Sequence, residues 1–173
     1  MASPTKREYP AKPSPLAIVA GLKLRLGLER ITEVASGSPL LEAAFELRRE
    51  VFVVEQGVPA ELEIDELDPE AIHLVAILDE AVVGTLRILQ HEGTAKIGRV
   101  AVRAAARGAG IGGRLMERAA EMVRERGFDE IVLHAQITVA GFYRRLGYVE
   151  EGEPFEEAGI PHIAMRKKIV PES

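Results

Sequence analysis

The sequence predicts an α/β fold in which one mixed, mostly antiparallel sheet carries helices on both faces. Short runs rich in β-branched residues, which favour strands, are interspersed with longer runs whose apolar residues recur at helical spacing. A glycine-rich stretch between one such strand and one such helix marks the middle of the 173-residue chain. The order strand-helix-helix-strand-strand-strand-helix-strand-helix-strand-strand, without an internal repeat, fits a single domain.

The N-terminal residues are predicted to lie outside this domain. Four of the first 15 residues are prolines and none of them falls in an apolar periodic pattern. Residues 1–21 are therefore expected to form a flexible extension, and residues 22–173 the domain. From Leu22 to Leu28 leucines alternate with other residues, which is typical of a half-buried strand that can continue to Val34.

Helical segments are predicted next. Ser38-Pro39 is a helix start, with serine as the cap and proline in the first turn. Apolar residues then follow at helical spacing as far as Phe52. After a break at residues 57–59, residues 60–67 are expected to form a short second helix or a loop rich in carboxylates.

Three strands are expected to follow. Residues 72–78 and 81–90 are rich in apolar and β-branched residues and are separated by Asp79-Glu80. They are predicted to pair as a hairpin. A third strand at residues 95–102 leads into the glycine-rich stretch.

The remaining elements alternate again. A helix over residues 111–126 is expected to end at Gly127, where a left-handed residue is typical. A nearly all-apolar strand at residues 131–136 and a helix at residues 139–146 come next. A further strand, an acidic loop and a last strand at residues 163–169 complete the predicted sheet.

The stretch Arg107-Gly108-Ala109-Gly110-Ile111-Gly112-Gly113 is predicted to bind an anion. Four glycines in six positions remove the side chains that would keep a ligand away from the backbone. The first amides of a helix have no partner within it, and the helix dipole adds partial positive charge there. A strand, a glycine loop and a helix start in this order favour a cradle for phosphate or pyrophosphate.

Two common phosphate-binding motifs fit this stretch poorly. Gly108-x-Gly110-x-x-Gly113 matches the dinucleotide pattern GxGxxG, but that pattern needs an acidic residue about 20 positions further on. The region from Leu133 to Ala135 carries no acid. A Walker loop requires Lys-Ser or Lys-Thr after its last glycine, whereas Arg114-Leu115 follows here.

The pattern Arg107-x-x-Gly110-x-Gly112 resembles the pyrophosphate loop of the GCN5-related N-acetyltransferases, the GNAT superfamily. Further segments, which together span roughly residues 33–168, are similar to its YjcF-like and ElaA-like branch. These segments are Val51–Gln56, Glu63–Asp68, His134–Gln136, Phe142-Tyr143 and Gly159–His162. The resemblance implies a GNAT fold and an acetyl-CoA-dependent N-acetyltransferase.

The resemblance also implies where acetyl-CoA binds. In the superfamily the strand before the loop splays from its neighbour and holds the pantetheine arm through its backbone, and the loop amides hold the pyrophosphate. Either Arg107 or Arg103 adds positive charge, unless both are solvated surface bases. The implied cofactor-binding residues are Val100, Ala101, Val102, Arg107, Gly108, Ala109, Gly110, Ile111, Gly112 and Gly113.

Tyr143 is the expected general acid, because its place in Phe142-Tyr143-x-x-x-Gly147 is similar to that of the tyrosine that protonates the departing thiolate in many GNAT enzymes. A phenol with a pKa of about 10 keeps its proton at neutral pH. The alternative is that both aromatic residues serve only to pack the core, which is the role expected for Phe142.

The general base stays open in the sequence. Many relatives carry a glutamate on the strand before the loop, but residues 96–102 contain no acid. The candidates are Glu63, Asp65, His73, His134 and His162. Of these, Glu63 and His73 are the expected catalytic residues. Arg87, Arg99 and His162 are expected to contact the acceptor.

The predicted function is therefore transfer of an acetyl group to a primary amine, either on a small molecule or on a protein side chain. Direct attack in a ternary complex is expected, because the chain has no cysteine to form an acyl-enzyme. One alternative is a non-catalytic acyl-CoA-binding or sensing domain. Another is a nucleotide-binding module, which the missing acid disfavours.

Composition excludes several other classes. The chain has no cysteine for disulfides or thiolate sites, and His134 has no partner at metal-ligand spacing, so no metal is expected. No apolar run approaches 18 residues, which argues against a membrane span. The net charge of −5 argues against nucleic acid as the main ligand. A cytoplasmic protein is expected, and the oligomeric state stays open, a homodimer included.

Charge placement suggests a preference among acceptors. Residues 50–86 and 147–165 contain no lysine or arginine, but hold ten and five acids respectively. If both stretches face the acceptor, a negative entrance would favour cationic amines. The alternative is that these acids only form solvated surfaces.

Overall fold

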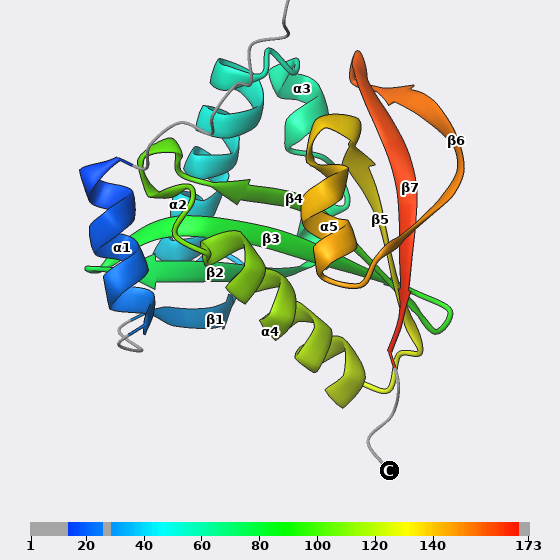
Figure 1. Cartoon of the computed structure of the whole chain (residues 1–173), viewed down its shortest axis with the longest axis horizontal. Coiled ribbons are helices and arrows are strands. Elements are labelled where there is room, and N and C mark those ends of the chain that lie inside the picture. The colour runs from blue at the N-terminus through cyan, green and yellow to red at the C-terminus, as the bar shows by residue number, and fades with distance from the viewer. Residues whose placement is uncertain (1–13, 26–28, 170–173) are drawn as a thin grey trace, which may run out of the picture.

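A computed structural model describes residues 14–25 and 29–169 of the chain (Figure 1). Its strands form one sheet in the order β1-β2-β3-β4-β5-β7-β6, in which only the β4–β5 pair is parallel. The strands are β1 (Arg30–Val34), β2 (Ile72–Leu78), β3 (Ala81–His91), β4 (Thr94–Val102), β5 (Glu130–Gln136), β6 (Val149–Glu157) and β7 (Ile160–Lys168). The predicted mixed, mostly antiparallel sheet is confirmed.

Tight turns connect the antiparallel neighbours. Asp79-Glu80, Glu92-Gly93 and Ala158-Gly159 each have positive φ at both residues, between 40° and 81°. Two such residues in succession form the turn whose twist matches that of the flanking strands. The predicted hairpin around Asp79-Glu80 is therefore confirmed, and a similar hairpin joins β6 to β7.

The helices cover both faces of the sheet (Figure 1). They are α1 (Pro15–Arg25), α2 (Pro39–Arg48), α3 (Ala60–Glu63), α4 (Ile111–Glu125) and α5 (Ala140–Arg145). A π-helical segment, η1 (Arg49–Glu55), continues α2. Short 3₁₀ turns are η2 (Asp68–Glu70), η3 (Ala104–Ala106) and η4 (Ile137–Val139). Ser38 caps α2 as predicted, since its hydroxyl accepts a hydrogen bond from Leu41 N at 3.2 Å.

Alternation along β2 explains why two separate cores form. Leu74 and Ala76 belong to the core beneath α1, α4 and α5, whereas Val75 and Ile77 belong to the core beneath α2. Successive side chains of a strand point to opposite faces of the sheet, so a nearly all-apolar strand contributes side chains to both cores. Gly84 on β3 lets α4 approach, because a Cβ there would lie 2.8 Å from a methyl group of Leu115.

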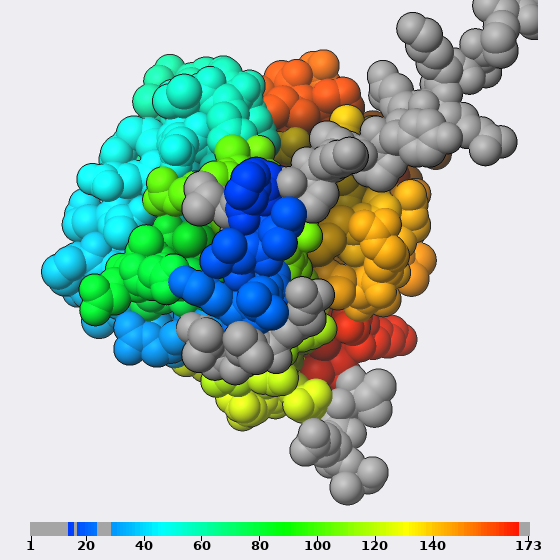
Figure 2. Space-filling view, turned by 60° about the vertical axis from the view of Figure 1, so that its left-hand side comes forward, coloured from blue at the N-terminus to red at the C-terminus, as the bar shows by residue number. Residues whose placement is uncertain are grey.

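The N-terminal predictions need correction. Residues 15–25 form helix α1, so the strand predicted to begin at Leu22 is wrong over residues 22–25, and residues 26–28 lie outside the described residues. Ser14 fixes the helix start, because its hydroxyl accepts from Ala17 N at 3.0 Å and donates to Ala105 O at 2.8 Å. Ala17 and Ala20 are buried, and Figure 2 shows α1 lying along the outside of the molecule. Small residues on one side of α1 allow this packing, which an alternation of leucines does not reveal.

The predicted extension and the predicted acidic loop change accordingly. Residues 14–21, assigned to the extension, pack against the body through α1 and η3, while residues 1–13 lie outside the described residues. The strand predicted after Tyr148 is confirmed as β6, but it continues through the acidic residues to Glu157, where an acidic loop was expected. Pairing with β7 holds this exposed strand in place despite its low β-propensity.

Candidate active site

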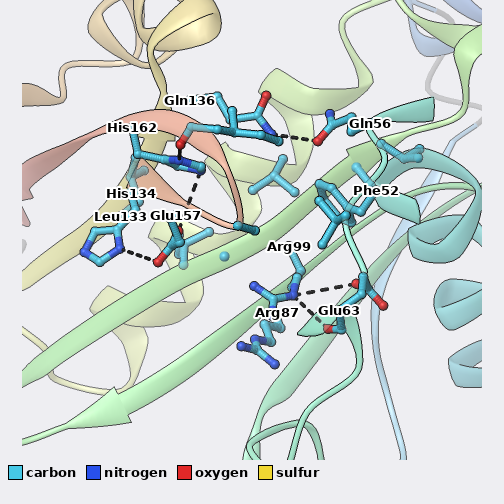
Figure 3. A pocket seen from close by; sticks show the side chains of 18 of the residues that line it. Phe52, Gln56, Glu63, Arg87, Arg99, Leu133, His134, Gln136, Glu157 and His162 are labelled. Atoms are coloured by element: carbon cyan, nitrogen blue, oxygen red, sulfur yellow. Dashed lines mark hydrogen bonds and ion pairs between the residues drawn. The ribbon is translucent and has the colours of Figure 1, made fainter. Parts of the chain in front are cut away.

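Strands β4 and β5 separate partway along their length and open a cleft. Their parallel pairing runs from Thr94–Glu130 to Ile97–Leu133 and stops there. A cleft of about 700 Å³ lies beyond that point, bounded by β4 on one side and by β5 and β7 on the other (Figure 3). A bulge at Arg99, whose φ is +54°, adds one residue to β4 where this strand faces β3. The bulge re-aims the strand at the place where the cleft begins.

The residues expected to bind pantetheine lie along this cleft. Val100, Ala101 and Val102 all line it. Ala101 and Val102 pair with β3 on their other side, so their strand still belongs to the sheet. The backbone edge that β5 would otherwise occupy faces the cleft, which is the geometry that an extended polar arm requires.

The glycine-rich stretch connects this strand to the start of α4. Gly108 and Gly110 adopt φ values of +81° and +93°, which favour glycine. The first helical hydrogen bond runs from Arg114 N to Gly110 O at 3.1 Å, so the amides of residues 111–113 precede it. Gly112 lies against Phe142, where an added Cβ would be 3.4 Å from the ring. The predicted glycine loop and the predicted helix start after it are confirmed.

Two arginines flank this cradle, and both have partners. Arg107 lines the cleft, and it donates from Nε to Val102 O at 2.9 Å and from Nη2 to both carboxylate oxygens of Glu55 at 2.8 and 3.0 Å. Arg103 pairs with Glu50 at 3.4 Å and donates to a β3 carbonyl. Only Arg107 is therefore placed to meet a ligand in the cleft.

Tyr143 lines the cleft from α5 and is only 8% exposed. Its ring packs edge-on against Phe142 and Tyr148, with centroids 4.9 and 6.0 Å away. Burial raises the pKa of the Tyr143 phenol to about 12. Tyr143 thus lines the cleft with a hydroxyl that is protonated at neutral pH, and a general acid must carry such a proton.

A network of paired charges forms one wall of the cleft, which we call the arginine wall. Its members are Arg48, Glu63, Asp65, Asp68, Arg87 and Arg99. Arg48 joins Glu63 at 2.6 Å and Asp68 at 2.7 Å, and all three are almost fully buried. Arg87 binds Asp65 through two parallel bonds of 2.6 and 2.9 Å. Three arginines and three carboxylates thus compensate one another.

Asp68 is the most highly bonded member of this wall. Its two oxygens accept hydrogen bonds from Arg48, from Arg87 and from the backbone N–H of Asp65, at distances of 2.7–3.1 Å. Burial by itself would raise the pKa of Asp68, but these bonds to Arg48, Asp65 and Arg87 lower it to about 2. The hydrogen bonds from Arg87 also lower the pKa of Asp65.

The arginine wall contains several residues that the sequence assigned to chemistry. Glu63, Arg87 and Arg99 line the cleft, and their charged groups pair within the arginine wall, although Oε2 of Glu63 and Nε of Arg87 are buried without a hydrogen-bond partner. Arg99 donates to Glu63 O and Leu62 O at 3.0 Å. These contacts favour a structural role for the three residues, in which they stabilise the wall of the cleft, over direct binding of an acceptor.

His73 does not reach the cleft. It lies behind the arginine wall, where its Nε2 hydrogen-bonds Asp68 O at 2.9 Å and its ring packs edge-on against Phe45. It lines a separate, smaller cavity of about 250 Å³. Burial lowers the pKa of His73. The structure thus separates His73 from the other predicted catalytic residues, because it points to the α2 face of the sheet.

The opposite wall contains three titratable side chains that meet in space, and we call it the histidine wall. Nδ1 of His134 lies 3.1 Å from Oε1 of Glu157, and Nε2 of His162 lies 3.6 Å from Oε2 (Figure 3). The Phe155 ring lies beside both imidazoles, with centroids 4.9 and 6.0 Å away. All three titratable residues line the cleft.

Glu157 is the residue of this wall that the sequence analysis missed. Burial by itself would raise the pKa of Glu157, but the hydrogen bond to His134 and the charges of His134, His162 and Lys96 lower it overall. The available signal was the alternation Phe155-x-Glu157 followed by Ala158-Gly159, which is typical of a strand and its turn. Because the acidic residues before Ala158 were predicted to form a loop, Glu157 was not predicted to face the cleft.

A glutamine pair links the two sides of the cleft. Gln136 at the end of β5 donates from Nε2 to Oε1 of Gln56 at 2.8 Å (Figure 3). Gln56 follows η1, which also supplies the cleft residues Val51 and Phe52. The π-helical segment therefore places side chains over the cleft opposite β5, which is a common use of π geometry near functional sites.

Within residues 14–25 and 29–169, no group of three or more His, Cys, Asp or Glu side chains has the geometry of a metal site. Among these same residues, no helix is long and apolar enough to cross a membrane.

Comparison with known proteins agrees with this geometry. Residues 32–169 match the family described as an acetyltransferase (GNAT) domain. The uncharacterized N-acetyltransferase YjcF of Bacillus subtilis is 40% identical over 135 residues, which cover 78% of this chain and 96% of that protein.

Two solved structures show the same fold. An acyl-CoA N-acyltransferase from Pseudomonas aeruginosa is 40% identical to this chain, with a TM-score of 0.72. The match covers 80% of this chain and 99% of the Pseudomonas chain. ElaA of Escherichia coli is 32% identical, with a TM-score of 0.71, and the match covers 80% of this chain and 97% of the ElaA chain.

Proposed function

We propose, since the chain belongs to the GNAT acetyltransferase family, that it moves the acetyl group of acetyl-CoA to a primary amine by direct attack in a ternary complex. The observation that carries this proposal is the cleft between β4 and β5, which leads from the bulge at Arg99 to the cradle at the start of α4. It offers a backbone edge for an extended arm and helix amides for a pyrophosphate.

That geometry supports the cofactor-binding residues that the resemblance implies. Backbone groups of Val100, Ala101 and Val102 bind the pantetheine arm, and the amides of residues 108–113 bind the pyrophosphate. Arg107 reaches the pyrophosphate by exchanging Glu55 for a phosphate oxygen. The Pseudomonas aeruginosa relative is described as an acyl-CoA N-acyltransferase, which supports a CoA thioester as the donor.

The chemistry needs a base for the amine and an acid for the thiolate. The neutral amine attacks the thioester carbonyl carbon, the C–S bond of the resulting tetrahedral adduct breaks, and the departing sulfur takes the proton of Tyr143. Burial makes the phenol a weaker acid, but it also makes a thiolate in the same place a stronger base, so the transfer stays favourable. The chain has no cysteine, which agrees with direct attack.

The acceptor enters between the arginine wall and the histidine wall. Arginines neutralise Glu63, Asp65 and Asp68, so these acids contribute less to a negative entrance than the sequence suggested. Glu157 is partly exposed and faces the cleft, and attracts the ammonium form of a primary amine.

Release of free CoA from acetyl-CoA, measured with a panel of primary amines, tests the reaction. Tyr143→Phe should reduce turnover about 10²–10⁴-fold while acetyl-CoA affinity changes little. Gly110→Asp should abolish acetyl-CoA binding in calorimetry, because it puts a side chain and a negative charge into the cradle. Tight acetyl-CoA binding without turnover of any amine would instead indicate an acyl-CoA-binding domain.

A further inference from the structure

We propose that His162, Glu157 and His134 together form the general base of this enzyme. In this assignment Nε2 of His162 takes the proton of the incoming ammonium group, Glu157 stabilises the imidazolium that forms, and His134 positions Glu157. The inference rests on the proposed acetyl transfer and supplies the base which that reaction lacks.

In both imidazoles, the hydrogen-bond partner indicates that Nδ1 is a donor. Nδ1 of His162 lies 2.6 Å from the carbonyl oxygen of Ile160, and a carbonyl can only accept, so Nδ1 carries a proton. Neutral His162 therefore has its lone pair on Nε2, on the side of Glu157. Nδ1 of His134 likewise donates to the Glu157 carboxylate at 3.1 Å.

The gap between His162 and Glu157 suits an ammonium group. Nε2 and Oε2 lie 3.6 Å apart, beyond hydrogen-bond distance, and in the neutral tautomer both atoms are acceptors. Two acceptors that face each other without a shared proton favour a donor between them. An ammonium group has three N–H donors and can contact both atoms.

The surroundings favour a base at this position over the other candidates. His162 is only 8% exposed and lines the cleft, so water competes little for its lone pair. Outside the trio, Lys96 of β4 also contributes positive charge near Glu157. By contrast, Glu63 is held by Arg48 and His73 lies outside the cleft.

Protons balance in this scheme. His162 takes one proton from the ammonium, and the neutral amine attacks the thioester. As the C–S bond breaks, Tyr143 protonates the sulfur, and the second proton lost from nitrogen restores the phenol. His162 then returns its proton to solvent through the cleft, so that each turnover releases one proton overall.

The first test uses NMR of the whole protein, which has four histidines, so that their ring nitrogens can be assigned individually. Neutral His162 should show the Nδ1–H tautomer. An Nε2–H tautomer would overturn the proposal, and this readout does not depend on knowing the acceptor.

The second test is kinetic and uses the amine that releases CoA fastest in the panel. His162→Asn keeps a donor for Ile160 O but removes the base, and should lower kcat/KM about 10²–10⁴-fold at pH 7. The loss of kcat/KM should become smaller as the pH approaches the pKa of the amine, because more of the amine then binds already deprotonated and needs no base. His91→Asn, at the exposed β3–β4 turn, is the matched control.

The outcomes separate the two proposals. Acetyl-CoA binding should be unchanged in His162→Asn by calorimetry, since this residue does not contact the cradle. A wild-type rate in His162→Asn at pH 7 would overturn the base assignment and leave acetyl transfer standing. Absence of CoA release by the wild-type enzyme with every amine would overturn the transfer, and the base role with it.

Discussion

The two walls of the cleft use charge in opposite ways. In the arginine wall the three carboxylates all pair with arginines, and Arg48, Glu63 and Asp68 are buried. In the histidine wall the bonds are longer, Glu157 and His134 are partly exposed, and one pair of atoms remains 3.6 Å apart. Paired buried charges cannot change protonation cheaply, whereas an imidazole outside such a network can. We infer that the first wall provides shape and the second provides chemistry.

This difference also explains the choice among candidate bases. Glu63 and Asp65 have suitable residue types, but the fold has already engaged them with arginine. A carboxylate that accepts charge-assisted hydrogen bonds is a weak base, because those bonds favour its ionised form.

The largest effect should come from breaking the arginine wall. Arg48→Ala leaves Glu63 and Asp68 buried without their main partner and should lower the free energy of unfolding by about 3–5 kcal/mol. Urea denaturation measures this loss. Arg118→Ala, which removes only exposed pairs with Glu121 and Glu125 on α4, is the control and should cost at most about 1 kcal/mol. Equal losses in both variants would contradict the role of the network.

Matched substitutions of one carboxylate in each wall should have crossed effects. Glu63→Gln should lower the free energy of unfolding by about 1–3 kcal/mol, because Arg48 loses a charged partner, and change kcat less than about tenfold. Glu157→Gln should cost at most about 1 kcal/mol, because its pair is partly exposed, but lower kcat more strongly. Urea denaturation measures the free energy of unfolding of both variants, and CoA release measures kcat on the same preparations. A larger kcat loss in Glu63→Gln would move the base to the arginine wall.

The pH dependence of stability should also reveal the arginine wall. The pKa of Asp68 is about 2 in the folded chain, against an ordinary value of 3.8. A carboxyl whose pKa is lower in the folded chain than in the unfolded chain stabilises the fold at pH values above its unfolded-state pKa. This stabilisation is lost as the pH falls through the folded-state pKa. Stability should therefore drop by about 2 kcal/mol between pH 4 and pH 2. Asp68→Asn should remove this step from denaturation curves recorded across that range.

The smallest effect is expected at the edge of the histidine wall. His134→Gln removes an exposed hydrogen bond to Glu157 and should change the free energy of unfolding by less than about 1 kcal/mol. Its activity should fall less than that of Glu157→Gln, since it acts only by positioning the carboxylate. A stability loss as large as that of Arg48→Ala would erase the contrast between the walls.

Local sequence determined several elements of the fold. Helix α4, the glycine cradle before it and the hairpin at Asp79-Glu80 were predicted closely, because apolar periodicity, glycine and turn chemistry act within a few residues. Tyr143 was predicted for a different reason, the resemblance of Phe142-Tyr143-x-x-x-Gly147 to a GNAT segment, and it lines the cleft. Helix α1 was missed, because the buried face of small residues that defines it depends on what lies beside it.

Only the tertiary structure decided which charges meet. Arg48 finds Glu63 and Asp68 because α2, α3 and η2 pack against the same end of the sheet. Glu157 finds His134 and His162 because β7 pairs with both β5 and β6, so strands that are distant in sequence become neighbours. Periodicity specifies the face on which a side chain lies, but not the partner across the sheet. Strand order and register supply that partner, and they depend on the packing of the whole core.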